Sequence, residues 1–516
     1  MININIVIFI LMNIVLYFSL TYLLNIYQQS HYDFKKLTKS FRSFYLTKPY
    51  MILSYISIVS LLINNIYVLI ILMILYFALI LYKPKYIIKL KYTNRIYRII
   101  ITTLLLVYIV LIITKLNTLV FSILNISIPL IIYIAVIINY PVEKLKKRYY
   151  IKKAKEKLLN NKNLLKIAIT GSYGKTSTKH ILYEVLKDYA VTVCTPESYN
   201  TILGLCTTIN NNVTNQTEVL IVEMGTNHLG EIKEMCKLIE PHIGVITEIG
   251  PQHLSTLKSM KNILKAKLEI SSHMTYDDVL IINGDNTYLE NIKPINIENI
   301  YKAGKKETNN YIVRNINIDV SNQYFDIYHN NKLKTKIETK LLGEHNINNI
   351  ILIYAVIDNI RNYIDIKDEI FSRLIKDIIP FNHRLKYKKQ NNLHIFDDSY
   401  NSNINGFKNA IKVMSKQLTK KIIITPGIVD NGSDEKRINE EIALTLINEM
   451  DEIYLIKNPV IKYYQNIFDE VRKEYIVFNS FKEAYIYLIC NHQKEEVSVL
   501  FENDLPDCYL ERWLNE

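Results

Sequence analysis

The stretch KIAITGSYGKTSTK, from Lys166 to Lys179, predicts how the following part of the chain folds. A short apolar run, IAI, leads into a Gly-x-x-Gly-Lys-Thr turn, and apolar residues then recur at helical spacing. Strand, glycine loop and helix are the context of a phosphate-binding loop, because loop N–H groups and a helix N-terminus attract phosphate oxygens. The general pattern has a further glycine five residues before Gly174, where this chain carries Ile169.

The two residues after the second glycine carry the chemistry of such a loop. Lys175 is placed to reach the terminal phosphates of a nucleotide, and the Thr176 hydroxyl is placed to bind Mg²⁺. A chance Gly-Lys-Thr turn is the alternative. The strand pattern before it and the helix pattern after it both disfavour that alternative.

Composition divides the chain into an apolar first part and a mixed second part. The 516 residues are long enough for about three domains. The net charge of +13 comes partly from Lys and Arg beside apolar segments, which favours anionic lipid over nucleic acid as a partner. No aromatic and basic nucleic-acid motif is present. The five cysteines show neither CxxC nor metal spacing and are typical of small core residues in a reducing compartment: Cys194, Cys206, Cys236, Cys490 and Cys508.

Four apolar stretches precede the glycine loop and predict a membrane region over residues 1–142. They are Ile4–Tyr27, Tyr50–Tyr82, Ile99–Thr114 and Leu119–Tyr140. The second is too long for one ordinary span, so we interpret it as a hairpin of two. Five spans then place both basic loops and the C-terminal part in the cytoplasm, as the charge bias requires. Four spans are the alternative. We expect a multi-pass protein of the cell membrane that contacts membrane lipid.

A basic segment follows the last apolar stretch. Residues 143–164 are rich in Lys and Arg, with Leu and Tyr interleaved. This pattern indicates either a basic helix on the inner membrane surface or a solvated linker helix.

The remainder of the chain predicts two α/β domains, residues 165–380 and 381–516. The apolar runs KIAIT, VLIVEMG, IGVITEI and VLIIN alternate with helical patterns, which indicates a parallel sheet covered by helices. Ligands of such sheets bind beyond the carboxyl ends of the strands. Pro380 marks a boundary, after which strand and helix alternate again. The predicted fold class is therefore an α-helical membrane region, a parallel-sheet central domain with the phosphate loop, and a smaller α/β C-terminal domain.

Three further residues are candidates for the chemistry at this sheet. Glu223 ends a strand and is a reasonable Mg²⁺ ligand, because hard cations prefer carboxylate oxygens, although a lone Glu there is often solvated. His253 follows another strand end and Lys267 lies in a helical pattern. Taken singly, that histidine indicates a structural residue and that lysine a surface residue.

Several strings together resemble one family. GSYGKTSTK, EMGTNHLGEI, TEIGPQHL, AKLEI, GEHNINN, HR and DDSYNSN follow one another as in the central and C-terminal domains of the Mur ligases. The resemblance covers residues 165 to 516 and implies an ATP-dependent amide ligase of peptidoglycan precursor synthesis. EMGTNHLGEI and DDSYNSN are most similar to the branch that adds D-alanyl-D-alanine to UDP-N-acetylmuramoyl-tripeptide, the MurF type.

The resemblance implies a role for each matching position. The ATP phosphates would be bound by Gly171, Ser172, Gly174, Lys175, Thr176 and Ser177. One Mg²⁺ would be held by Thr176 and Glu223, and a second would involve His253 and Lys267, with Lys267 carbamylated by CO₂. The adenine side would be formed by Asn346 and Asn349, and the C-terminal domain would contribute His383, Arg384 and Asp398. The substrate side would include Asn200 and His228.

The implied reaction passes through an acyl phosphate. A carboxylate takes the γ-phosphoryl group of ATP, an amine then attacks, and phosphate leaves as the amide forms; Lys175, His253, Lys267 and Arg384 would be the catalytic residues. Apolar segments stand where the MurF type carries its UDP-sugar domain, so the acceptor is either nucleotide-linked or lipid-linked. The amine is an amino acid or a dipeptide.

Three alternatives remain open at the level of sequence. A poly-γ-glutamate-type ligase also combines a membrane segment with this ATP core, although EMGTNHLGEI argues against it. A non-enzymatic membrane protein switched by ATP is disfavoured, because the predicted spans contain almost no ionisable residues. An inactive scaffold is disfavoured because Lys175, Glu223, His253 and Lys267 are all present.

Overall fold

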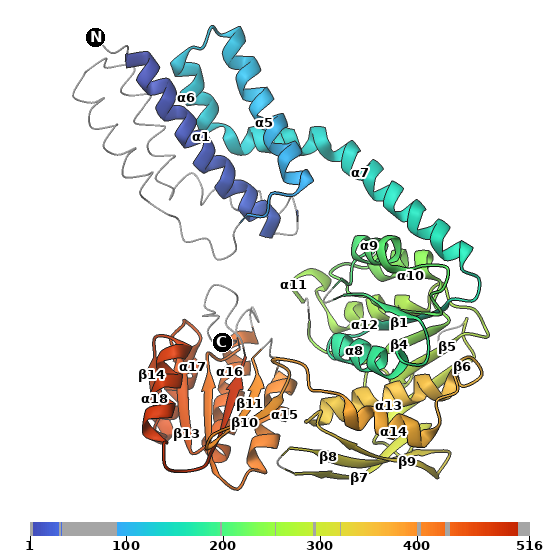
Figure 1. The fold of residues 1–516 in the computed structure, drawn as a ribbon. Coiled ribbons are helices and arrows are strands. Elements are labelled where there is room, and N and C mark those ends of the chain that lie inside the picture. The colour runs from blue at the N-terminus through green and yellow to red at the C-terminus, as the bar shows by residue number, and fades with distance from the viewer. Residues whose placement is uncertain are drawn as a thin grey trace. The chain divides into compact units, whose positions relative to one another are not determined.

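The computed structural model divides the chain into two compact units, residues 1–148 and 149–516 (Figure 1). The structure describes residues 4–29, 32, 90–196, 199–252, 254–292, 296–319, 321–399, 404–428 and 434–503. Each unit has a hydrophobic core of its own.

The regular elements described in the first unit are all helices. Its helices are α1 (Ile4–Gln29), α5 (Asn94–Ile113), α6 (Thr118–Ile126) and α7 (Ile128–Asn160), the last of which continues into the second unit. Apolar side chains from all four helices form one buried cluster. Thr93 and Asn117 cap the N-termini of α5 and α6 with their side-chain oxygens.

The predicted apolar segment Leu119–Tyr140 is wrong as a single span. It is divided at Ser127 into α6 and the start of α7. The break coincides with Pro129, which lies in the first turn of α7, where the missing N–H of proline is tolerated. The nine residues of α6 extend only about 14 Å, too short to cross a bilayer.

Two of the described helices, α5 and α7, are long and apolar enough to cross a membrane. The prediction of about five spans is therefore not confirmed. The segment Tyr50–Tyr82 and the basic loop before it lie outside the described residues.

The basic segment predicted after residue 142 is not a separate helix. The structure shows no break there, and α7 runs from its apolar first half into its basic second half through Pro141. Ala154 and Leu158, near the C-terminal end of α7, pack into the core of the second unit.

The second unit contains a nine-stranded sheet in the order β2-β3-β1-β4-β5-β6-β7-β8-β9. Its strands are β1 (Leu165–Thr170), β2 (Thr192–Cys194), β3 (Val219–Glu223), β4 (Ile243–Ile246), β5 (Val279–Asn283), β6 (Asn299–Gly304), β7 (Tyr311–Ile318), β8 (Gln323–His329) and β9 (Lys332–Thr339). The pairs from β2 to β7 are parallel, as predicted for β1, β3, β4 and β5, and β7, β8 and β9 extend the sheet as an antiparallel meander.

Helices cover both faces of this sheet because its central strands are apolar on both sides. Ile167 and Ile169 face one cluster and Ala168 faces the other, as the alternation along a strand requires. The first cluster includes α8 (Lys175–Leu186), α13 (Glu344–Asn359) and α14 (Asp368–Asp377). The second includes α9 (Ile202–Asn212), α10 (Glu231–Ile239), α12 (Met260–Leu268) and the 3₁₀ turn η1 (Glu269–Ser271); α11 (Leu254–Leu257) precedes α12.

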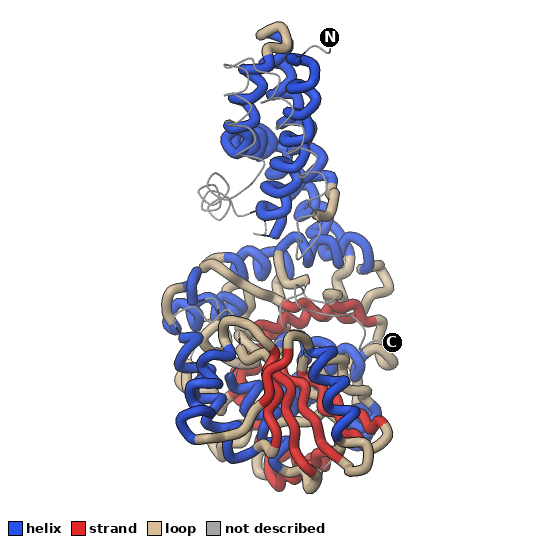
Figure 2. The backbone as a smooth tube through the Cα atoms, turned by 90° about the vertical axis from the view of Figure 1, so that its left-hand side faces the viewer, coloured by secondary structure: helices blue, strands red, loops and turns tan. Residues whose placement is uncertain are grey.

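A second sheet follows in the order β10-β11-β15-β12-β13-β14. Its strands are β10 (Lys386–Gln390), β11 (Leu393–Asp398), β12 (Lys420–Thr425), β13 (Glu452–Ile456), β14 (Ile476–Phe478) and β15 (Val497–Glu502), all parallel to their neighbours except β10. On one face lie α15 (Ile404–Ser415), α16 (Glu435–Glu449) and α17 (Ile461–Val471), and on the other lies α18 (Phe481–Asn491) (Figure 2). Pro380 lies between α14 and β10.

Candidate active site

The predicted phosphate loop is the turn between β1 and α8. The end of the neighbouring strand β4 and the residues after it hold this turn in place. The Ser172 hydroxyl donates to the Gly250 carbonyl oxygen at 2.9 Å and accepts from the Gly250 N–H at 3.0 Å. The Thr247 hydroxyl donates to the Tyr173 carbonyl oxygen. These bonds fix the loop at the carboxyl edge of the sheet, where ligands of parallel sheets bind.

Both glycines of the loop are required by close approach and by backbone conformation. A Cβ on Gly171 would lie 2.1 Å from the Thr247 hydroxyl oxygen, and its φ is +152°. A Cβ on Gly174 would lie 2.8 Å from the Asn349 amide oxygen, and its φ is +82°. Ile169, at the place of the missing upstream glycine, is fully buried in β1. The loop therefore requires glycine at positions 171 and 174 but not at position 169.

Lys175 is folded back onto the loop. Its Nζ donates to the carbonyl oxygens of Gly171 at 2.7 Å and Ser172 at 3.2 Å. Burial lowers the pKa of the Lys175 amine, the Glu223 carboxylate opposes that shift, and the Arg384 charge adds to it. The effect of Arg384, a residue from the chain that leads into the second sheet, indicates that this guanidinium lies near the loop.

Glu223, at the end of β3, is the centre of a buried polar cluster with Thr176, Lys179 and Asn200. Its Oε2 accepts from the Thr176 hydroxyl at 2.9 Å and lies 3.4 Å from the Lys179 Nζ. Its Oε1 accepts from the Asn200 amide at 3.3 Å. The Glu223 and Lys179 side chains are 2% and 0% exposed, so this ion pair is excluded from water. We call these four residues the Glu223 cluster.

Sequence reasoning missed Lys179. The signal was available in the quoted stretch, because Lys179 lies three residues before Leu182 and seven before Leu186, on the apolar face of α8. A lysine in that position is buried, and buried lysines are almost always paired. The pattern therefore called for an acidic partner at the sheet, and the structure shows that this partner is Glu223.

Lys267 is buried near the end of α12, which begins after the Ser259 cap. Its side chain is almost wholly excluded from water, and its Nζ has no hydrogen-bond partner among the described residues. Burial lowers the pKa of this amine well below its usual range, the Lys175 charge adds to that shift, and Glu223 and Glu231 oppose it. Burial thus disfavours the charged form of this amine, which lies within the electrostatic range of the loop and the Glu223 cluster.

Two of the four predicted metal ligands, Thr176 and Glu223, are brought into contact. Their hydroxyl and carboxylate oxygens are donors that suit Mg²⁺. Among the described residues no group of three or more His, Cys, Asp or Glu side chains forms a metal site. His253, a predicted metal ligand, lies outside the described residues.

Asn346 and Asn349, predicted to face adenine, are buried in the first turns of α13. The Asn349 amide oxygen accepts from the Thr178 hydroxyl at 3.1 Å, which ties α13 to the helix of the phosphate loop. The Asn346 amide donates to the Leu342 carbonyl oxygen at 2.8 Å. Both side chains are placed beside the loop helix, and their role toward a base stays a prediction.

The predicted C-terminal residues form a compact group at the start of the second sheet. His383 and Leu385 have φ of +60° and +48°, and Arg384 lies between them. The Leu385 N–H donates to Asp398 Oδ1 at 3.1 Å. The His383 Nδ1 lies 2.9 Å from Asp397 Oδ2.

The two predicted substrate residues lie in different surroundings. Asn200 belongs to the Glu223 cluster, and Gly225 allows this approach because a Cβ there would lie 2.7 Å from the Asn200 side chain. The His228 side chain is exposed, and its backbone N–H donates to Glu231 at 3.0 Å, near the start of α10. A role in substrate binding stays a prediction for both.

The fold and the loop place the second unit among the α/β proteins with a phosphate-binding loop at the carboxyl edge of a parallel sheet. Residues 169–357 match the Mur ligase middle domain. This part of the chain thus matches the Mur ligase family, as its motifs predicted.

Curated relatives with one shared name match this part of the chain. The UDP-N-acetylmuramoyl-tripeptide–D-alanyl-D-alanine ligase of Rickettsia prowazekii is 28% identical over 299 residues, which cover 56% of this chain and 65% of that protein. The Bacillus subtilis protein of the same name is 27% identical over 292 residues, 56% of this chain and 62% of its own length. The chain thus spans a little under two thirds of these two relatives.

Solved structures show the same fold. MurF from Thermotoga maritima, solved in complex with ADP, matches with a TM-score of 0.63 at 22% identity and covers 72% of this chain and 82% of that one. A MurF structure from Acinetobacter baumannii matches with a TM-score of 0.61 at 22% identity, covering 69% of this chain and 77% of that one.

A substitution at Gly171 tests the geometry of the loop. We expect Gly171→Ala to weaken nucleotide binding about a hundredfold, because the added methyl group displaces the loop from Thr247 and small misplacements are costly. Calorimetric titration with ADP measures the effect. Gly230→Ala is the matched control, since Gly230 also has a positive φ but a Cβ there meets nothing within 4 Å. Equal losses in the two variants would contradict the steric argument.

The carboxyl of Asp398 predicts a pH-dependent stability. Burial raises the pKa of Asp398 from its ordinary 3.8 to about 7, while Arg384 and the Leu385 N–H oppose that shift. A raised folded-state pKa means that this group's contribution to stability is complete below pH 3.8 and is lost as the pH rises through 7.

Asp398→Asn should therefore exceed the wild-type unfolding temperature by little near pH 4 and by progressively more as the pH rises to 8.5. Thermal unfolding of both proteins across this range gives the measurement. A difference between the two proteins that does not vary with pH would show that Asp398 is charged throughout.

Proposed function

We propose that this chain is a membrane-bound, ATP-dependent amide ligase of the Mur ligase type. It joins an amino acid or a dipeptide to a carboxylate in peptidoglycan precursor synthesis, with D-alanyl-D-alanine as the amine of first choice. The observation that carries the proposal is the Glu223 cluster, in which Glu223 and Thr176 meet directly beside a phosphate loop. The family match and the shared name of the relatives support the same reaction.

The two sheets support the domain assignment. Residues 165–380 would bind ATP, and residues 381–516 would form the C-terminal domain that contributes Arg384 and Asp398. Residues 1–142 would anchor the chain in the cell membrane, with both α/β domains in the cytoplasm. The apolar helices α5 and α7 and the basic second half of α7 support this placement.

The loop supplies the binding of the triphosphate. Lys175 now uses its N–H groups on the carbonyl oxygens of Gly171 and Ser172. Phosphate oxygens are stronger acceptors than carbonyl oxygens for a charged donor, so a bound triphosphate would draw the amine away from the loop. The substrate carboxylate then attacks the γ-phosphorus and ADP leaves. The amine next attacks the acyl carbon, phosphate leaves, and the amine releases a proton.

The residues present fit Mg²⁺ beside the phosphates. Thr176 and Glu223 would hold it, and the ion would neutralise charge on the transferred phosphoryl group. Lys179 would keep the Glu223 carboxylate fixed at the end of β3, because its Nζ lies on the same oxygen as the Thr176 hydroxyl.

Lys267 fits the carbamylation that the family resemblance implies. An uncharged amine adds to CO₂, giving a carbamate anion and releasing a proton. Its Nζ is buried without a hydrogen-bond partner among the described residues, and such an orphaned atom is costly unless it is modified or receives a ligand. The carbamate would place a second anion beside the Glu223 cluster, where a second Mg²⁺ and His253 would complete the site.

Phosphate release by the detergent-solubilised full chain tests the proposed reaction. We expect release with Mg²⁺-ATP to require UDP-N-acetylmuramoyl-tripeptide, or a lipid-linked form of it, together with D-alanyl-D-alanine. Lys175→Ala should lower the rate by about a hundredfold or more, because a cation beside the transferred group is lost. Release with glutamate alone would replace the proposal by a poly-γ-glutamate-type ligase. Full turnover in Lys175→Ala would show that Lys175 of the phosphate loop does not take part in the reaction.

Carbamylation of Lys267 has a readout that does not depend on turnover. The protein incubated with ¹³C-bicarbonate should give a carbamate carbon signal by NMR, and Lys267→Ala should lack it. Lys265→Ala is the control, because Lys265 lies in the same helix but on its partly exposed side. If Lys267→Ala is inactive, short carboxylic acids should restore part of its activity. An unchanged signal in Lys267→Ala would assign the carbamate to another lysine.

A further inference from the structure

The first unit contains a cavity of about 370 Å³, within the roughly 300–1,000 Å³ that is typical of small-ligand sites. Aromatic, apolar and charged side chains line it together: Tyr27, Tyr32, Arg95, Ile99, Tyr133, Val136, Ile137, Asn139, Tyr140 and Glu143. We call it the Arg95 pocket. Nothing in the proposed ligase reaction uses it.

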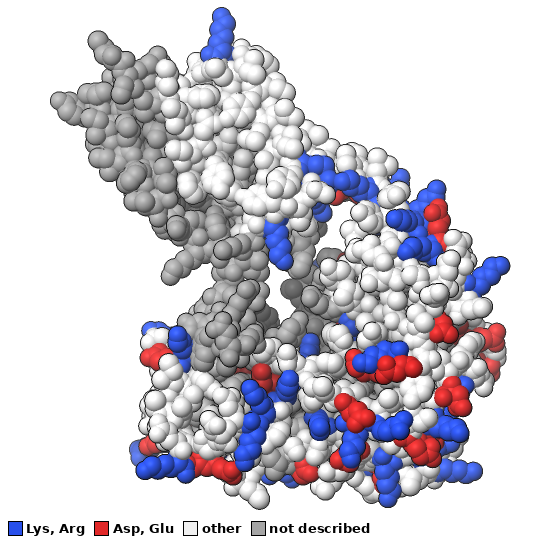
Figure 3. Space-filling view, in the orientation of Figure 1, with Lys and Arg blue, Asp and Glu red and all other residues white. Residues whose placement is uncertain are grey.

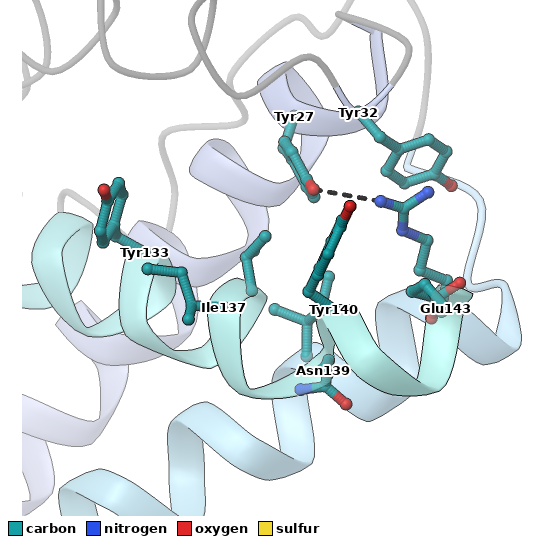
Figure 4. Close-up of a pocket in the computed structure, with 10 residues that line it drawn as sticks. Tyr27, Tyr32, Tyr133, Ile137, Asn139, Tyr140 and Glu143 are labelled. Atoms are coloured by element: carbon teal, nitrogen blue, oxygen red, sulfur yellow. Dashed lines mark hydrogen bonds between the residues drawn. The ribbon is translucent and has the colours of Figure 1, made fainter. Parts of the chain in front are cut away.

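Arg95 is the cation of this pocket, and tyrosines hold it in place. Its guanidinium lies 4.0 Å from the centre of the Tyr32 ring, and one Nη donates to the Tyr27 hydroxyl at 3.2 Å. Figure 4 shows that bond as a dashed line, with Tyr140 pointing toward the same place from α7. The Arg95 Nε is buried and has no hydrogen-bond partner among the described residues.

The charge of the pocket favours an anion. Glu143 is the acidic residue in its lining, and Arg98 already forms an ion pair with that carboxylate. These two charges cancel, which leaves the single positive charge of Arg95. A guanidinium with an unused N–H matches the oxygens of a phosphate group, to which arginine donates several hydrogen bonds at once.

The position of the pocket indicates that its ligand also has an apolar part. Arg95 is the second residue of α5, Tyr27 lies in the last turn of α1, and Glu143 is followed in α7 by a run of basic residues, Lys144, Lys146, Lys147 and Arg148. Figure 3 shows Lys and Arg atoms gathered where α7 leaves the apolar helices, whose described surface on this face is otherwise mostly uncharged. Ile99, Val136 and Ile137 line the apolar side. The pocket thus lies where apolar helix surface gives way to basic surface.

We propose that the Arg95 pocket binds the phosphate-bearing headgroup of an anionic lipid. The phosphate would lie on Arg95 among the tyrosine hydroxyls, and the lipid chain would leave along Ile99, Val136 and Ile137. Tyrosine and arginine at the boundary of an apolar helix bundle are suited to that level of a bilayer. The inference rests on the membrane placement in the proposed function and is independent of the ligase reaction.

Lipid binding by the full chain in a neutral detergent tests the inference. Dioctanoyl phosphatidic acid is the anionic probe, dioctanoyl phosphatidylcholine is the zwitterionic comparison, and inorganic phosphate is the free anion; native mass spectrometry gives the bound fraction of each. We expect phosphatidic acid to bind more tightly than either of the others. Arg95→Gln should weaken its binding about tenfold, because a charge-assisted hydrogen bond is lost.

Lys146→Gln is the matched control, because it removes the same charge from an exposed position of α7 outside the pocket. It should change binding less than twofold, since an exposed charge is screened by solvent and salt. Arg95→Lys keeps the charge and should retain part of the binding. Thermal unfolding of each variant shows whether it is folded. Equal losses in Arg95→Gln and Lys146→Gln would show that binding reflects general electrostatic attraction, and would contradict lipid binding at the Arg95 pocket.

Two further outcomes would also overturn the inference. Inorganic phosphate that binds as tightly as phosphatidic acid would make the ligand a free anion, and equal binding of phosphatidylcholine would remove the role of charge. Phosphate release by the same variants reports on the ligase separately. If the chain shows no ligase turnover but still binds phosphatidic acid through Arg95, the proposed reaction is wrong and the lipid site stands.

Discussion

The buried carboxylate of Glu223 is the constraint on which the arrangement of the site depends. A carboxylate removed from water is costly unless it is paired and its oxygens are hydrogen-bonded. Here Lys179 and Thr176 from α8 satisfy one oxygen, and Asn200, from the loop before α9, satisfies the other. Three segments that are separate in sequence must therefore meet at the end of β3.

The sheet register makes that meeting possible. Ile169 of β1 pairs with Glu223 of β3. Glu223 therefore lies beside the end of β1, one residue before β1 leads into the phosphate loop. The helix that begins at Lys175 then presents Thr176 and Lys179 to the same oxygen. The loop and the acid belong together because parallel neighbours end at one edge of the sheet.

Sequence alone predicted the parts of this site that depend on local pattern. The strand, the glycine loop and the helix follow from the local pattern of residues 166–186, and the structure contains all three. The family strings placed Glu223 and Lys267 near the loop although each, taken singly, indicates a surface residue. The pairing of Lys179 was missed, because its partner lies 44 positions further along the chain, in another strand. A local pattern can show that a lysine faces a core, but only the tertiary fold shows what it meets there.

The departures in the first unit have a similar cause. Hydropathy counted residues 119–140 as one segment, since Ile, Leu and Val continue through it. The structure divides the segment at Ser127, two residues before Pro129, whose missing N–H removes one bond of the helical ladder. A hydropathy average does not detect the loss of a single backbone N–H donor. At residue 142 the change from apolar to basic side chains suggested a boundary, but that change does not interrupt helical hydrogen bonding, and α7 continues.

The electrostatics of the loop explain why an anion belongs there and why both sheets contribute to the site. Burial and the Arg384 charge lower the pKa of the Lys175 amine, and burial and the Lys175 charge lower the pKa of the Lys267 amine. Glu223 opposes these effects, but its own carboxylate is already paired with Lys179. Lys175 and Arg384 therefore place positive charge in a poorly solvated region, which would favour an anion there.

Arg384 takes part in this balance only while the second sheet lies close to the first. It stands between two residues with left-handed backbone conformation, at the junction that leads into β10. A triphosphate in the loop would attract Arg384 more strongly in arrangements that bring the guanidinium near than in arrangements that do not. A ligand that interacts differently with two arrangements shifts the population toward the one it prefers. The positive charge of Arg384 thus gives a bound nucleotide a physical means of drawing the second sheet toward the first.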